Sequence, residues 1–339
     1  MAHRDLIVIG ASAGGVDALK TLVRALPADL PAAVCIVLHL SPHSQSLLPQ
    51  ILSRATGLHA LHASDGAPLL PGHIYVAIPD HHLLIEGERI RVMRGPKENR
   101  HRPAVDPLFR SAARSRGNRV IGVVLTGSLD DGTAGLHAIK RHGGVAVVQD
   151  PNEALYPSMP LSALKEVEID HSVPLAALGP LLARLAAEDI AAEPPRDAAP
   201  ALAEEGEIVL RQLDEENGAP SAFSCPSCGG VLWEIREDEL VRYRCRVGHA
   251  FLPDSMFAEQ TDAMEAALWT ALKTLEESAA LARRMADHAR QRGHDLSVSQ
   301  FEERSRLAEH HAQTIRQVLD GPPLAGDQPD PELEETTGA

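Results

Sequence analysis

Three short segments of the sequence carry side chains suited to acyl transfer. Residues 10–14 have the pattern Gly-x-Ser-x-Gly, in which Ser12 lies between glycines that permit a sharp turn and leave room around the hydroxyl. His39 and the pair Asp130 and Asp131 each follow a separate apolar run. A histidine beside a serine can act as a base, and a carboxylate can orient its imidazole. The pattern favours a serine hydrolase, although a glycine-rich turn alone could equally bind a phosphate.

A second set of residues has the spacing of a metal site. Cys225 and Cys228 form one pair, and Cys245 and His249 form another after a predicted hairpin. Tetrahedral zinc binds this Cys₃His set, and a closed four-ligand site is structural rather than catalytic. A unit of about thirty residues buries little core, so the metal would supply folding energy. We therefore expect structural Zn²⁺ here and no cofactor for catalysis, whereas Cys35 lies in an apolar run and fits a buried small side chain.

The elements that position these residues follow from the hydrophobic pattern. Continuous apolar runs predict strands buried on both faces, at Leu6–Ile9, Ala33–Leu38, Ile74–Ala77, Val120–Leu125 and Val145–Val148. Helical spacing predicts helices at Val16–Ala25, Ser46–Ala55, Pro107–Arg116 and Thr133–His142, and Leu83–Val92 reads as a hairpin. This alternation predicts an α/β fold, a doubly wound, mostly parallel sheet with helices on both faces. Ligand sites of such sheets lie at the carboxyl ends of strands, where Ser12 and His39 fall.

The rest of the chain divides by composition. We expect a catalytic domain at 1–188, a proline- and alanine-rich linker at 189–220 and a zinc-ribbon-like unit at 221–252. Helix formers dominate 253–319, where Gly293 would break the segment into a hairpin, and the tail 320–339 would be disordered. Because a linker lies between them, the metal unit should be independent of the hydrolase, and chelation should spare hydrolysis of a small ester.

Charge and hydropathy exclude several partners. The 32 basic and 47 acidic side chains give a net charge of −15, which disfavours nucleic acid. The sequence has no apolar run long enough to span a membrane and no signal-peptide pattern at its start. We therefore expect a cytoplasmic protein without membrane insertion.

Four blocks in order make residues 5–188 resemble the catalytic domain of the chemotaxis response-regulator protein-glutamate methylesterases. They are Ile9–Gly15, the histidine at 39, Asn99–Asp106, and Leu125–Gly127 with Asp131-Gly132. The resemblance implies that Ser12 is the nucleophile, His39 the base and Asp131 the carboxylate, with Asp130 as the alternative. It implies hydrolysis of γ-glutamyl methyl esters on a methylated chemoreceptor or a related signalling protein, and deamidation of selected glutamines there.

The resemblance also raises points that the motifs leave open. The basic residues Arg100, His101 and Arg102 could meet an acidic receptor surface and are secondary candidates for substrate binding. Members that set the type carry an N-terminal receiver domain, whereas the first strand starts here at Asp5, so control by phosphorylation is not expected. The alternative is a noncatalytic signalling adaptor that binds partners through the zinc unit. The helical segment could mediate self-association or partner binding.

Overall fold

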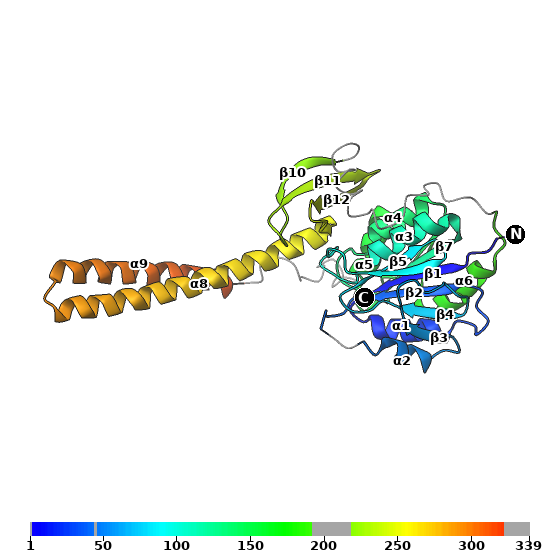
Figure 1. Ribbon diagram of the computed structural model, residues 1–339, viewed down its shortest axis with the longest axis horizontal. Helices are drawn as coiled ribbons and strands as arrows, with labels where there is room; N and C mark the ends of the chain where they lie inside the picture. Colours follow the sequence, from blue (N-terminus) through cyan, green and yellow to red (C-terminus); the bar gives the residue numbers. More distant parts are fainter. Residues whose placement is uncertain (1, 44–45, 192–217, 322–339) are drawn as a thin grey trace, which may run out of the picture. The chain divides into compact units, whose positions relative to one another are not determined.

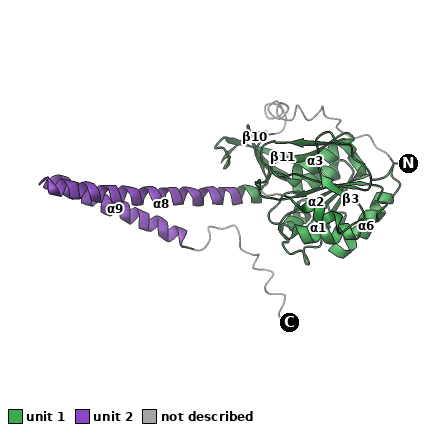
Figure 2. Cartoon of the chain, turned by 60° about the horizontal axis from the view of Figure 1, so that its bottom comes forward, with its two compact units in different colours: residues 1–256 green, residues 257–339 purple. Residues whose placement is uncertain are grey.

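The structure is a computed structural model that describes residues 2–43, 46–191 and 218–321. It contains two compact units, Met1–Met256 and Phe257–Ala339, which Figure 2 shows in different colours. The predicted linker and the predicted disordered tail fall mainly on residues 192–217 and 322–339, outside the described residues.

A seven-stranded parallel sheet forms the centre of the first unit, which confirms the predicted fold class. The strand order is β3-β4-β2-β1-β7-β8-β9, and every neighbouring pair is parallel. The strands are β1 (Leu6–Ala11), β2 (Ala33–Leu38), β3 (His59–His62), β4 (His73–Val76), β7 (Val120–Val124), β8 (Val145–Gln149) and β9 (His171–Val173). From β1 the sheet grows in one direction through β2 and in the other through β7, so the switch point lies beside β1.

Helices cover both faces of this sheet (Figure 1). Successive side chains of a strand point to opposite faces, so Ile7 and Ile9 join one core cluster while Leu6 and Val8 join the other. The first cluster packs under α1 (Gly15–Arg24), α2 (Leu48–Ser53) and α6 (Leu175–Ala187). The second packs under α3 (Val105–Arg116), α4 (Thr133–Arg141) and α5 (Ser158–Glu166). The predicted hairpin, β5 (His82–Glu86) with β6 (Arg89–Met93), is a separate two-stranded sheet whose apolar side chains join the second cluster.

The cysteine-rich segment forms a small antiparallel sheet within the first unit. Its strands, in order, are β10 (Gly218–Ser224), β11 (Val231–Glu237), β12 (Leu240–Cys245) and β13 (Ala250–Phe251). The core of this Cys/His unit is only a few side chains, Cys225, Leu232, Cys245, Phe251 and Met256. The structure differs here from the expectation of an independent unit, because this sheet belongs to the same compact unit as the parallel sheet.

Two long helices make up the described part of the second unit. Helix α8 (Pro253–Gln291) starts in the first unit and continues into the second, and α9 (Asp295–Leu319) follows a turn in which Gly293 has a φ of 68°. Ion pairs Arg283–Glu309 and Arg290–Glu302 join the two helices in antiparallel order. The helical hairpin and its glycine turn therefore agree with the sequence pattern. None of the helices in the described ranges has the length and apolar character needed to cross a membrane.

Candidate active site

Ser12 lies in the tight turn between β1 and α1. Strand β1 ends at Ala11, Gly14 adopts a φ of 72°, and α1 begins at Gly15. The Ser12 N–H donates to the Thr126 carbonyl at 3.0 Å, so the segment that follows β7 holds the turn in place. Ser12 is half-buried at the carboxyl end of the central strand, which leaves its hydroxyl beside the switch point of the sheet.

The segment after β7 approaches Ser12 so closely that it needs a glycine. A Cβ atom added to Gly127 would lie 2.1 Å from Met159 Sδ and 2.8 Å from Ser12 Cβ. The neighbouring Thr126 hydroxyl donates to the Ala13 carbonyl at 3.1 Å and accepts the Tyr156 N–H at 2.9 Å. Thr126 and Gly127 therefore hold the serine turn against the loop that leads into α5.

His39 and Asp131 form a buried pair beside this turn. Nε2 of His39 lies 2.7 Å from Oδ2 of Asp131, and the two side chains are only 4% and 2% exposed. The backbone N–H of His39 donates to the Ala11 carbonyl at 3.1 Å, which fixes the residue next to the end of β1. A proton on Nε2 is the arrangement that lets the ring donate to a carboxylate, and it leaves Nδ1 with a lone pair. Nδ1 is buried without a hydrogen-bond partner, and no hydrogen bond joins it to Ser12 within the described residues.

Four donors surround the Asp131 carboxylate. Oδ2 accepts the Val105 N–H at 2.6 Å in addition to His39, and Oδ1 accepts the Asp106 N–H at 3.1 Å and the Asn99 amide at 2.8 Å. Burial by itself would raise the pKa of Asp131, but the bonds from His39, Val105 and Asn99 lower it to about 2. Asp131 is therefore an ionised carboxylate in a fixed orientation.

A second buried carboxylate, Asp106, shares this network. Its Oδ1 accepts the N–H groups of Gly132 at 3.1 Å and Gly135 at 2.6 Å, and its Oδ2 accepts the Asn99 amide at 2.8 Å. Burial and the nearby negative charge of Asp131 raise the pKa of Asp106 to about 7. The Asn99 amide thus bridges two carboxylates of different acidity. Asn99 and Asp106 both lie in the motif 99–106, but the sequence alone predicts a role for neither residue.

Asp130, the alternative carboxylate, has other partners. Its Oδ2 accepts the N–H groups of Asp254 at 3.0 Å and Ser255 at 3.1 Å, and its Oδ1 accepts the Ser255 hydroxyl. Burial raises the pKa of Asp130 to about 6, although the bonds from Ser255 oppose the shift. The structure therefore brings Asp131 to His39 and assigns Asp130 to the first turn of α8. The turn that directs Asp130 and Asp131 to different partners includes Leu129, whose φ of 66° is a left-handed conformation uncommon for leucine.

The three basic residues predicted to contact substrate differ in their surroundings. The ring of His101 stacks on that of His39, with centroids 3.6 Å apart and planes 11° from parallel. Burial, together with the neighbouring His39, lowers the pKa of His101 to about 3, so its ring is neutral. Arg102 donates to Asp80 at 2.8 Å and to the Gly95 carbonyl at 2.6 Å, so its guanidinium serves an internal ion pair. Arg100 is half-buried in the same segment, and its contact with substrate stays a prediction.

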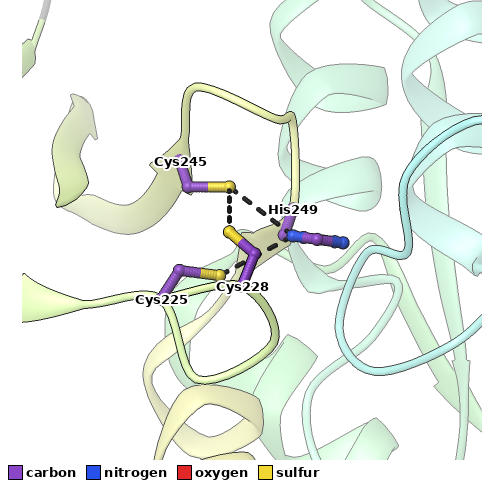
Figure 3. A group of neighbouring side chains, drawn as sticks. All are labelled: Cys225, Cys228, Cys245 and His249. Carbon is purple, nitrogen blue, oxygen red and sulfur yellow. Dashed lines mark hydrogen bonds between the residues drawn. The ribbon is translucent and has the colours of Figure 1, made fainter. Parts of the chain in front are cut away.

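The four predicted metal ligands converge (Figure 3). Their ligand atoms all lie within 4.8 Å of one another, with Cys228 Sγ 3.7 Å from Cys245 Sγ, and His249 Nδ1 3.6 Å from Cys245 Sγ and 3.7 Å from Cys225 Sγ. Ligand atoms on a tetrahedral zinc, with Zn–S near 2.3 Å, are separated by about 3.8 Å. Burial raises the pKa of the Cys225 thiol to about 12, so an empty cluster would keep that proton. The donor set and its spacing fit zinc.

Known proteins resemble the part of the chain that carries Ser12, His39 and Asp131. A putative protein-glutamate methylesterase/protein-glutamine glutaminase of Leptospira interrogans is 37% identical over 182 residues, which cover 53% of this chain and 94% of the relative. A protein of Xanthomonas campestris with the corresponding name, numbered 1, is 39% identical over 187 residues, 54% of this chain and 52% of the relative. This chain thus spans about half the length of the second relative.

A solved structure extends this similarity to the fold. The crystal structure of the Thermotoga maritima CheB methylesterase catalytic domain superposes with a TM-score of 0.52 at 30% identity, and it covers 55% of this chain and 100% of the solved one. A protein-family model described as CheB methylesterase matches residues 7–182, which include both the serine turn and the buried His39–Asp131 pair. With its fold, its site and its sequence in agreement, this chain belongs to the CheB methylesterase family.

Proposed function

We propose that the protein is a protein-glutamate methylesterase that hydrolyses γ-glutamyl methyl esters on a methylated chemoreceptor or a related signalling protein. The observation that carries this proposal is the buried His39–Asp131 pair beside Ser12, at the carboxyl ends of adjacent strands. The names of the relatives from Leptospira and Xanthomonas support the substrate class.

The geometry assigns a role to each residue of the triad. The Ser12 hydroxyl attacks the ester carbonyl while Nδ1 of His39, the ring nitrogen that has no partner among the described residues, accepts its proton. Asp131 remains ionised and stabilises the positive charge that develops on the ring. His39 then protonates the leaving methanol, and water, activated in turn by His39, releases the glutamate and restores Ser12.

Backbone N–H groups at the start of α1 are suited to stabilise the oxyanion. Helix α1 begins at Gly15, whose N–H donates to the Ser12 carbonyl at 2.9 Å. The donors suited to an oxyanion are therefore the N–H groups that follow it in the first turn, which lack partners within the helix. This stabilisation needs no side chain, so an alanine after the nucleophile, Ala13, is compatible with catalysis.

The same site could deamidate glutamine. Attack of Ser12 on a glutamine side chain forms the same acyl-enzyme, and ammonia leaves in place of methanol. The relatives carry the name protein-glutamine glutaminase together with protein-glutamate methylesterase. Deamidation is therefore the second proposed activity of the site.

The noncatalytic adaptor is less compatible with this site. Burial of an ionised carboxylate costs stability, so a noncatalytic scaffold has no need of the buried hydrogen bond between His39 and Asp131. A ring nitrogen that is buried without a partner among the described residues lowers the stability of the fold. Nδ1 of His39 is such an atom, and this arrangement suits a base that accepts the proton of Ser12.

We also propose that Cys225, Cys228, Cys245 and His249 hold one structural zinc ion. Each pair occupies a tight turn, since Gly229 N–H donates to the Cys225 carbonyl at 2.7 Å and Gly248 N–H to the Cys245 carbonyl at 2.9 Å. Elemental analysis should give about one zinc per chain, and Cys228→Ser should lower that content whereas Cys35→Ser should not. Equal zinc content in both variants would contradict the ligand set. The helical hairpin remains a proposed site of self-association or partner binding, which light scattering of the full chain can test.

Ser12→Ala tests the esterase proposal directly. Methanol release from methyl-labelled receptor membranes should fall by at least about ten-thousand-fold, because the nucleophile is lost. Ser64→Ala, a change at an exposed serine away from the site, is the matched control and should keep full activity. Turnover of Ser12→Ala close to that of the control would exclude Ser12 as the nucleophile.

A further inference from the structure

The Cys/His unit forms hydrogen bonds with Asn99, the residue that bridges the two buried carboxylates. The Asn99 N–H donates to the Ala250 carbonyl at 2.8 Å, and the Leu252 N–H donates to Oδ1 of Asn99 at 2.9 Å. Ala250 follows the metal ligand His249 directly in the chain. Asn99 is only 2% exposed, so these bonds are shielded from water.

Other contacts seat the Cys/His unit against the segment before Asn99 and against α4. Leu240 and Leu252 pack with Ala134 of α4 in one small apolar cluster. His137 of the same helix lies 3.3 Å from Asp238 in the turn between β11 and β12. A Cβ atom added to Gly248 would lie 2.8 Å from Pro96, so this turn between the metal ligands touches the segment before Asn99. The unit is therefore docked at several points around the active-site network.

The bond from Leu252 determines which way the Asn99 amide points. An asparagine side chain has one acceptor oxygen and one NH₂ donor group. Because the Leu252 N–H occupies Oδ1, the NH₂ group faces the opposite side, where it donates to Asp106 and Asp131. Without the bond from Leu252 the Asn99 NH₂ group would still donate to the carboxylates, but the Cys/His unit would no longer fix the position of the amide.

We propose that Asn99 is a positioning residue for ester hydrolysis and that the metal-held Cys/His unit sets its position. The chain of contacts runs from His249 through Ala250 and Leu252 to Asn99, and from there to Asp131 and His39. Metal loss at the Cys₃His site then lowers turnover, in contrast to the sequence expectation that chelation spares the hydrolase. The inference rests on the proposed esterase function.

A double-mutant cycle in the full-length chain tests the coupling. Asn99→Gly removes the amide but accepts the φ of 46° at this position, and Cys228→Ser removes a metal ligand. Each change should lower kcat for a small ester by about tenfold, because the hydrogen bond from Asn99 to the charged Asp131 is lost or weakened. KM should be nearly unchanged, because Asn99 does not touch the substrate. The kcat of the double variant should be close to that of the less active single variant, since both changes act through one contact. Multiplication of the two losses would overturn the proposal. Asn118→Gly, at an asparagine before the amino end of β7 whose amide donates to the Ala191 carbonyl, is the control.

Hydrogen exchange provides a readout independent of activity. Removal of metal from the wild-type chain with a chelator should speed exchange of backbone amides in residues 97–106, and added zinc should restore protection. Amides of the central strand β1 should not change. Unchanged exchange at 97–106 after metal removal would refute the coupling even if the esterase is active. A wild-type chain that exchanges as expected but hydrolyses no ester would instead refute the proposed function.

Discussion

Replacement of Asp131 by asparagine is the sharpest test of the site, because the carboxylate accepts donors on both oxygens. Oδ1 accepts Asp106 N–H and the Asn99 amide, and Oδ2 accepts His39 and Val105 N–H. An asparagine has one oxygen, so one of these two pairs of donors must face an NH₂ group. Neither orientation of the new amide preserves the network.

The consequence for catalysis depends on the tautomer of His39. If the new NH₂ group takes the place of Oδ2, Nε2 must become an acceptor and the ring proton moves to Nδ1, the atom proposed as the base. A wrong tautomer of this kind costs about ten-thousand-fold in kcat, or roughly 5.5 kcal/mol at about 1.4 kcal/mol for each factor of ten. The unpaired Val105 N–H should also lower the free energy of unfolding by about 1–3 kcal/mol.

Asp130→Asn is the matched control, since it changes the adjacent carboxylate. Its oxygen can still accept the N–H groups of Asp254 and Ser255, and its new NH₂ group can donate to the Ser255 hydroxyl. We expect kcat within about tenfold of wild type, because no catalytic contact is lost. Both variants should be compared by initial rates of methanol release and by urea unfolding. If Asp130→Asn abolishes turnover while Asp131→Asn is active, the assignment of the carboxylate is refuted.

Two further predictions follow from the close contacts and the acidities of the network. Gly127→Ala should lower kcat at least about tenfold and destabilise the fold by about 1–3 kcal/mol, because the added methyl group would overlap Met159 and displace Ser12. Initial rates and thermal unfolding measure the two effects, and an unchanged rate would contradict the close approach of Gly127 to Ser12. The pKa of Asp106 is raised to about 7 in the folded state, so its stabilising contribution is complete below about pH 4 and is lost as the pH rises to about 7. The free energy of unfolding, measured by urea titration across this range, should decline less in Asp106→Asn, and an equal decline would contradict a raised pKa.

Local sequence signals predicted the parts of the fold whose burial is symmetric. Strands β1, β2 and β7 are apolar without interruption, because helices cover both faces, and each was predicted to within two residues. Strands β3 and β9 were missed because they lie at the edges of the sheet and carry polar residues, such as His59 and His171. Helix α6 was missed for the opposite reason, since its sequence is apolar nearly all round and includes Pro180.

The active-site network was predictable only in part. Ser12 and His39 follow strands directly, so the topology alone brings them to one edge of the sheet. The choice between Asp130 and Asp131 depends on the backbone turn at Leu129, which no local pattern specifies. The bond between Leu252 and Asn99 joins positions 153 residues apart, so it arises from the docking of two sheets and leaves no signal in either segment.

The different acidities of the two buried carboxylates explain why one network can serve a single histidine. Asp131 is ionised because four donors surround it, whereas Asp106 retains its proton up to about pH 7, since burial and the charge of Asp131 both oppose its ionisation. Below that pH the network presents one negative charge to the ring of His39, which becomes positive in the proposed mechanism. His101, stacked on the same ring, is neutral and adds no repulsion. Asn99 donates to both carboxylates, and its bond helps to keep the pKa of Asp131 low, so the residue proposed to be positioned by the Cys/His unit also contributes to this balance of charge.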